Sequence, residues 1–341
     1  MTIERVRYRG WENCWKFANE SVELIVLADV GPRVIWYGLR GGENQFHEVE
    51  QDAGRTGSVE FRLYGGHRLW ASPEIARTYF PDNSAVKVVR QGHRVRFTAP
   101  REDVPPGTKL QKEMEIELAA EGSEVRVTHR ITNHHKETTE LAVWSPTMMH
   151  AGGRAILPLP ERHAMDKDHF LPVGVFGMWS YTDFADERWR LGTEFVELQQ
   201  AQNPKGRFQE QMGGIFNPAG WGAHFRRDTL FVKRASVIAG ARYPDGGCNF
   251  ELFTNPEFLE VETLGPLVEL KPGATAEHIE RWWLFGGVPD GKGEKWVREV
   301  VVPRVEERVK VERTAGSSIA VAFAPANLGM TRCIGTWEVV A

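Results

Sequence analysis

The densest group of chemically useful side chains in this sequence of 341 residues lies between positions 63 and 74. Its members are His67, Arg68, Trp70 and Glu74, which follow the glycine pair Gly65-Gly66. An imidazole exchanges protons near neutral pH, a guanidinium holds oxygen atoms in a fixed fork, and glycines let the backbone approach a ligand or turn sharply. The stretch therefore predicts a binding or acid–base site. The plain alternative is a tight turn with a solvated histidine and arginine and a core tryptophan.

A second group lies on a predicted strand at Phe258–Leu264. Strand alternation divides its residues between two faces, with Leu259, Val261 and Thr263 on one and Glu260, Glu262 and Leu264 on the other. Two carboxylates on one apolar face raise each other's pKa, which suits a general acid or base working near neutral pH. The alternative is an outward strand face on which both glutamates are solvated.

A third stretch, from Trp144 to Arg154, carries a histidine directly before Ala151 and a glycine pair. This histidine, His150, either projects into a binding site or caps the strand end in solvent. His129 lies on the apolar face of a predicted strand, among β-branched neighbours, and we expect a hydrogen-bonded core histidine there. Most of the twelve tryptophans are expected to fill a β core. A few are expected to offer flat apolar platforms of the kind that the C–H face of a sugar favours.

Composition and motif spacing exclude several classes of protein. The net charge of −4 argues against a nucleic-acid binder, and no run of about 18 apolar residues is present to span a membrane as a helix. No phosphate-binding loop, Gly-x-Ser-x-Gly elbow or His-Glu-x-x-His helix occurs.

Neither a metal site nor a disulfide framework is expected. Cys14, Cys248 and Cys333 are widely separated along the chain, and the adjacent His134-His135 would point to opposite faces of a strand. The first 15 residues lack an apolar leader segment, so the cytoplasm is the expected location.

Strands must position these side chains, because period-two alternation dominates the sequence. In Leu110–Leu118, for example, apolar residues alternate with glutamine and glutamate. Further strands are predicted at Val22–Leu27, Arg33–Leu39, Val86–Arg90, Arg94–Ala99, Glu124–Ile131, Thr138–Thr147, Thr193–Gln199, Leu230–Val237, Asn249–Thr254 and His278–Phe285. No helix longer than about ten residues is predicted, and strand–helix alternation is missing, which argues against a doubly wound α/β fold.

This many antiparallel strands require two large stacked sheets or a barrel to cover their faces. No period of about 40–50 residues indicates a propeller. Composition changes near Val302-Pro303, so we expect a main domain over residues 1–302 and a C-terminal appendage over residues 303–341. Within the appendage, Ser317–Phe323 and Ile334–Val340 are candidates to pair as a hairpin.

Taken in this order, the three stretches resemble the galactose mutarotase-like (aldose 1-epimerase-like) superfamily. The most telling part is Glu262-Thr-Leu-Gly-Pro, then the Pro272-Gly273 turn, then a Trp282-Trp-Leu-Phe strand. The Gly65-Gly66 element resembles the family's substrate-binding Gly-Gly segment, and Ile131-Thr-Asn133 resembles the strand before its catalytic histidine. The resemblance covers roughly residues 20–287 and implies an all-β fold, a β-supersandwich of large antiparallel sheets with a sugar-binding cleft.

The resemblance also implies acid–base chemistry without a cofactor, acting on a mono- or oligosaccharide. Glu262 would take the proton of the anomeric hydroxyl, and His67 or His150 would protonate the ring oxygen. The residues expected to hold or stack on the sugar are Arg68, Trp70, Glu74, Trp144 and Glu260.

Two other functions stay open at this point. One is a carbohydrate-binding or sensing protein that keeps the cleft but lacks the acid. The other is an accessory domain of a polysaccharide lyase or glycosidase, because supersandwich domains also occur beside catalytic modules. Neither a nucleic acid nor a membrane is expected as a partner, and the oligomeric state is open.

Overall fold

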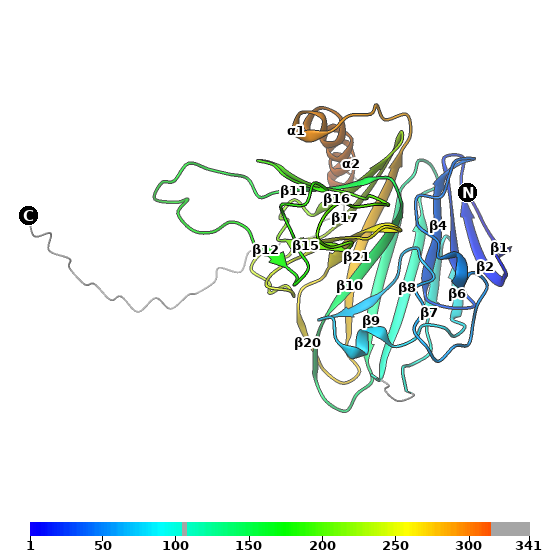
Figure 1. Cartoon of the computed structure of the whole chain (residues 1–341). Coiled ribbons are helices and arrows are strands. Elements are labelled where there is room, and N and C mark those ends of the chain that lie inside the picture. Colours follow the sequence, from blue (N-terminus) through cyan, green and yellow to red (C-terminus); the bar gives the residue numbers. More distant parts are fainter. Residues whose placement is uncertain (104–107, 315–341) are drawn as a thin grey trace, which may run out of the picture.

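The computed structural model describes residues 1–103 and 108–314, and strands make up most of it (Figure 1). A four-stranded sheet contains, in spatial order, β1 (Thr2–Tyr8), β2 (Trp11–Ala18), β3 (Val22–Leu27) and β4 (Arg33–Leu39). A seven-stranded sheet contains β12 (Phe176–Met178), β15 (Gln211–Ile215), β18 (Phe250–Thr254), β19 (Phe258–Leu264), β10 (Thr139–His150) and β20 (Val268–Leu270), with β5 (Trp70–Ser72) paired to β10.

The third sheet has ten strands. They are β13 (Trp189–Leu191), β14 (Phe195–Gln199), β11 (Arg154–Pro158), β16 (Trp221–Arg226), β17 (Thr229–Ala235), β21 (Thr275–Phe285), β9 (Val125–Asn133), β8 (Leu110–Leu118), β7 (Arg94–Thr98) and β6 (Lys87–Gln91). Short 3₁₀ turns are η1 (Glu50–Asp52) and η2 (Ala76–Tyr79).

Single-residue bridges join the four- and seven-stranded sheets edge to edge. His67 bridges Val34 of β4 on one side and Thr147 of β10 on the other, and Phe46 bridges Met149 of β10. These two sheets therefore form one layer. The ten-stranded sheet forms the other layer.

One hydrophobic core lies between the two layers. Its buried side chains come from all three sheets and include Phe17, Leu24, Phe97, Ile116, Leu259, Val261 and Trp282. Alternate residues of each strand supply this core, because successive strand side chains point to opposite faces. The expected all-β supersandwich is confirmed.

The glycine pair before His67 is required by the close approach of neighbouring backbones. Gly66 has a φ of +70°, and a Cβ atom there would lie 2.2 Å from the carbonyl oxygen of Val34. Gly65 has a φ of +98°, and its Cβ would lie 2.2 Å from the carbonyl oxygen of His47. Only glycine tolerates both conditions. The pair thus lets this segment pass between β4 and β10.

The described chain ends in a continuous helical stretch of α1 (Gly293–Trp296), a π-helical turn η3 (Val297–Val301) and α2 (Val302–Thr314). Because α2 has 13 residues, the expectation of no helix longer than about ten residues is wrong. Trp296, Val297, Val301 and Val305 pack with side chains of the ten-stranded sheet that lie outside the main core, such as Ile156, Phe225 and Trp283. Figure 1 shows α1 and α2 beside β11 and β16 of this sheet.

Helix α2 begins at the proposed domain boundary, and the predicted hairpin at 317–323 and 334–340 lies outside the described residues. No helix in the described ranges is both long enough and apolar enough to cross a membrane.

Candidate functional site

Strand β19 carries core residues on one face and carboxylates on the other. Leu259 and Val261 belong to the main core, so Glu260 and Glu262 point away from it, on the outer face of the seven-stranded sheet. Glu260 is only 7% exposed and Glu262 only 1% exposed. The alternative of a solvated strand face is therefore wrong.

Predicted site residues that lie far apart in sequence meet on this outer face. Trp144 donates a hydrogen bond from Nε1 to Oε2 of Glu262 over 2.6 Å, and Arg68 donates from Nη2 to Oε1 of Glu260 over 2.9 Å. The Arg68 guanidinium lies 3.8 Å from the Trp70 ring centroid, and the Trp70 and Trp144 rings are 5.0 Å apart. Two carboxyl groups, one guanidinium and two indoles thus form one cluster.

Strand register explains this convergence. In the pairing of β10 with β19, Trp144 is opposite Leu264 and Pro146 is opposite Glu262, and β5 places Trp70 opposite Trp144. Residues directly opposite in an antiparallel pair point to the same face. The backbone N–H of Arg68 donates to the carbonyl of Pro146, which holds the arginine beside Glu260 and Glu262.

Glu74 lies at the rim of the cluster. It accepts a hydrogen bond from the Tyr79 hydroxyl, and the Tyr79 ring packs edge-on against Trp70 with centroids 5.5 Å apart. Tyr79 is 42% exposed, so the site meets solvent here. Burial raises the pKa of Tyr181, and the carboxylates of Glu74 and Glu262 raise it further.

Burial sets the protonation of the two β19 carboxyl groups. It raises the pKa of Glu262 well above its usual range, and the neighbouring Glu260 carboxylate raises it further, while the hydrogen bond from Trp144 opposes the shift. Burial also raises the pKa of Glu260, against the effect of Arg68. A glutamate with a raised pKa is suited to proton transfer near neutral pH.

Glu251, which is not among the predicted site residues, belongs to β18 and pairs directly with Glu262 of β19. It is 1% exposed, and its Oε1 atom has no hydrogen-bond partner among residues 1–103 and 108–314. The sequence contains a signal for this pairing, because strands are predicted at both 249–254 and 258–264. A hairpin with the four-residue loop 255–258 places the two glutamates opposite each other, whereas a loop of three residues would place Glu251 opposite Val261.

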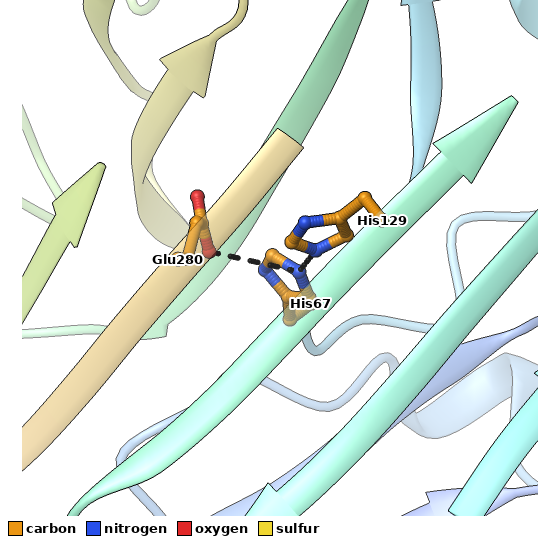
Figure 2. Close-up of side chains that lie close together, drawn as sticks. All are labelled: His67, His129 and Glu280. Atoms are coloured by element: carbon orange, nitrogen blue, oxygen red, sulfur yellow. Dashed lines mark hydrogen bonds and ion pairs between the residues drawn. The ribbon is translucent and has the colours of Figure 1, made fainter. Parts of the chain in front are cut away.

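His67 does not lie with this cluster. It directly precedes Arg68, so its side chain points to the other face of the layer, into the interior between the sheets. Figure 2 shows its ring directed at His129 and Glu280, and its Nε2 lies 2.7 Å from Nε2 of His129 and 3.9 Å from Oε2 of Glu280. Its Nδ1 lies 2.8 Å from the Thr147 hydroxyl.

The hydrogen bonds of this interior group define its protons. Nδ1 of His129 lies 3.1 Å from the carbonyl oxygen of His278 and must donate to it. Burial lowers the pKa of His129 to about 4 and that of His67 well below its usual range, so both rings are neutral. Nε2 of His129 is then an acceptor, and His67 donates to it. His129 is the hydrogen-bonded core histidine that the sequence predicts, and His67 is another.

By donor type, the interior group could also hold a metal ion, since ligand atoms of His67, His129 and Glu280 lie within 4.8 Å of one another. Lys233, however, already neutralises the carboxylate, with Nζ 2.8 Å from Oε1 of Glu280. A divalent ion would place more positive charge beside a buried ammonium group. We therefore interpret the group as a structural network.

His150 lies at the far end of β10, opposite Phe258. It is four residues beyond Pro146, the partner of Glu262, or about 13 Å along the strand. A pocket of about 380 Å³ lies near this end and is lined by His47, Glu48, Val49, Glu50, Gln51, Gln202, Pro256 and Glu257. None of the predicted site residues is among its lining residues.

Comparison with known proteins gives structural matches but no sequence match. No protein-family model and no curated protein matches this chain. The Slr1438 protein from Synechocystis sp. PCC 6803 has a TM-score of 0.53 at 10% identity, over 83% of this chain and 99% of that one. A TPR-domain containing protein from Parabacteroides distasonis ATCC 8503 has a TM-score of 0.52 at 14% identity, over 82% of this chain and 48% of that one.

A third match carries the family's name. A galactose mutarotase-like protein from Lactobacillus casei ATCC 334 has a TM-score of 0.50 at 12% identity, over 80% of this chain and 100% of that one. At such identities a match shows the fold alone. The chain therefore has the galactose mutarotase-like fold.

Proposed function

We propose that this protein is a carbohydrate-active enzyme of the aldose 1-epimerase type, in which Glu262 acts as the general base. The observation that best supports this proposal is the position of Glu262. Its carboxyl group is buried on a sheet face, hydrogen-bonded to Trp144 and next to the Arg68–Glu260 pair. The fold shared with a galactose mutarotase-like protein adds support by analogy.

The composition of the cluster suits a sugar. Trp70 and Trp144 supply indole rings, the type of apolar surface on which the C–H bonds of a pyranose pack. The guanidinium of Arg68 and the carboxyl group of Glu260 can hydrogen-bond to ring hydroxyls as donor and acceptor. A ligand of this kind needs only a few polar groups among apolar ones for orientation.

Mutarotation needs proton transfer at two oxygens. Glu262 takes the proton of the anomeric hydroxyl while a second group protonates the ring oxygen and the C1–O5 bond breaks. Rotation about C1–C2 and reclosure on the other face of the carbonyl then give the other anomer, and the protons return. Each positioned acid or base contributes about 10²–10⁴-fold to the rate.

One observation favours the alternative of a carbohydrate-binding or sensing protein without catalysis. Within the part of the chain that the structure describes, no histidine bonds to Glu262, and the predicted acids His67 and His150 lie elsewhere. The accessory-domain alternative predicts stronger affinity for oligosaccharides than for monosaccharides.

Polarimetry of freshly dissolved α-anomers of glucose, galactose and other aldoses tests the proposal. We expect the wild-type protein to accelerate anomer exchange and Glu262→Gln to lose that acceleration. Glu257→Gln, an exposed residue on the same hairpin, is the matched control and keeps the wild-type rate. Sugar binding without acceleration by the wild-type protein would reject the enzyme in favour of the binding protein.

A further inference from the structure

We propose that Glu251 is the proton donor that works with Glu262, so that two glutamates on adjacent strands form the acid–base pair. This inference rests on the proposed function and names the acid that the predicted histidines do not supply.

The hairpin of β18 and β19 places the two side chains together. Glu251 and Glu262 are directly opposite in its register, so both point to the outer face of the sheet. Cβ atoms of directly opposite residues lie about 4.5–5.5 Å apart. The anomeric and ring oxygens of a pyranose are bonded to the same carbon, so two carboxyl groups at this spacing can reach both oxygens of one sugar.

Among the described residues, one carboxyl oxygen of Glu251 has no hydrogen-bond partner, while the carboxyl group is also hydrogen-bonded to the side chain of Asp245. Its Oε1 is buried and unpaired, which is costly for an ionised carboxyl group. The β15 residue opposite it is Gly214, where a Cβ would lie 3.1 Å from Cγ of Glu251 and 2.7 Å from Sγ of Cys248. A glycine at this position leaves room for the carboxyl group.

The charges around the pair favour one shared proton. The guanidinium of Arg68 donates one hydrogen bond to Glu260, and its charge opposes the rise in the pKa of Glu262. Burial raises the pKa of Glu251 well above its usual range, and the carboxylates of Glu262 and Asp245 raise it further. Two such neighbouring groups titrate as a pair, and the singly protonated form provides one acid and one base.

The proton balance of the reaction closes within this pair. Ionised Glu262 accepts the proton of the anomeric hydroxyl, and protonated Glu251 donates its proton to the ring oxygen as the C1–O5 bond breaks. On reclosure, the C5 hydroxyl returns a proton to Glu251, and Glu262 protonates the aldehyde oxygen. No cofactor or outside reactant is consumed, and the pair holds one proton before and after each turnover.

The experiment compares Glu251→Gln, Glu262→Gln and the double variant by polarimetry with α-glucose and α-galactose over a range of pH. We expect Glu251→Gln to reduce kcat by about 10²–10⁴-fold. The double variant should be no slower than the slower single variant, because the groups act as a unit. The wild-type profile should be bell-shaped, and Glu251→Gln should lose its alkaline limb.

The outcomes separate this inference from the proposed function. A Glu251→Gln variant with the wild-type rate and an intact alkaline limb, beside an inactive Glu262→Gln, overturns the role of Glu251 and keeps the enzyme. A wild-type protein without anomer exchange overturns both proposals. Should Glu251→Gln not fold, Glu251→Ala with added formate replaces it. Recovery of the rate by formate supports the assignment, and full activity without formate overturns it.

Discussion

Replacing Lys233 with methionine tests the ionic network that ties the two layers together. Lys233 and Glu280 are both 0% exposed, with Nζ 2.8 Å from Oε1. The ammonium also lies 3.0 Å from the Ser145 carbonyl oxygen, 2.9 Å from the Thr147 hydroxyl and 3.1 Å from the Val261 carbonyl oxygen. Methionine fills a similar volume, so its effect reports the lost charge and hydrogen bonds.

We expect the free energy of unfolding to fall by about 3–5 kcal/mol, because the substitution leaves a buried carboxylate without its cation. Thr263 and Trp282 still donate hydrogen bonds to Glu280, which favours the lower end of that range. The double variant Lys233→Met/Glu280→Gln should recover most of the loss, since both charges are then gone.

Equilibrium unfolding in urea, followed by tryptophan fluorescence, measures these differences. Lys16→Met is the matched control, because Lys16 pairs with Glu23 at the partly exposed surface, where removal costs no more than about 1 kcal/mol. A loss at Lys233 no greater than at Lys16, or a double variant no better than the single one, would refute the conclusion that Lys233 neutralises Glu280. A metal site at His67 would then regain support.

Three further predictions follow from the two faces of the layer. His67→Gln should lower the free energy of unfolding, measured in urea, by about 1–3 kcal/mol and leave the sugar affinity, measured by calorimetry, unchanged. Unchanged stability with a loss of sugar affinity would place His67 at the ligand. Trp144→Phe removes a hydrogen-bond donor to the carboxylate of Glu262, so the pKa of Glu262 should rise. The acid limb of the pH–rate profile should then move to higher pH, and an acid limb at the wild-type pH would contradict this prediction. Glu251→Gln should be more stable than wild type at neutral pH in thermal unfolding. Because the pKa of Glu251 is raised in the folded state, protonated Glu251 contributes stability that is fully present below about pH 4.3 and is lost as pH rises through the folded-state pKa. A stability difference between Glu251→Gln and wild type that stays constant across pH would refute that shift.

The alternation of apolar and polar residues predicted most of the fold. The predicted strands Val22–Leu27, Arg33–Leu39, Leu110–Leu118 and Phe258–Leu264 coincide with the observed bounds, because each shows regular alternation or a continuous apolar run. Helix α2 was missed for a physical reason. Its sequence and that of η3 are rich in valine, which lowers helix propensity, and packing on the ten-stranded sheet outweighs that preference.

The site was predictable where alternation was regular and unpredictable where it was not. Regular alternation in β19 separated Glu260 and Glu262 from the core residues. At Gly65-Gly66 the positive φ angles interrupt the strand geometry, so the sequence could not show which face His67 would take. A displacement of one residue exchanges the faces of His67 and Arg68. Only long-range pairing with β10 decides between them.

Anomer exchange measured side by side in wild-type protein and Glu262→Gln tests the base assignment most directly. We predict rapid equilibration of an α-aldose by the wild type and equilibration at the buffer rate by Glu262→Gln, with sugar affinity preserved in both. A substituted protein that equilibrates the sugar as fast as the wild type would contradict the assignment of Glu262 as the base.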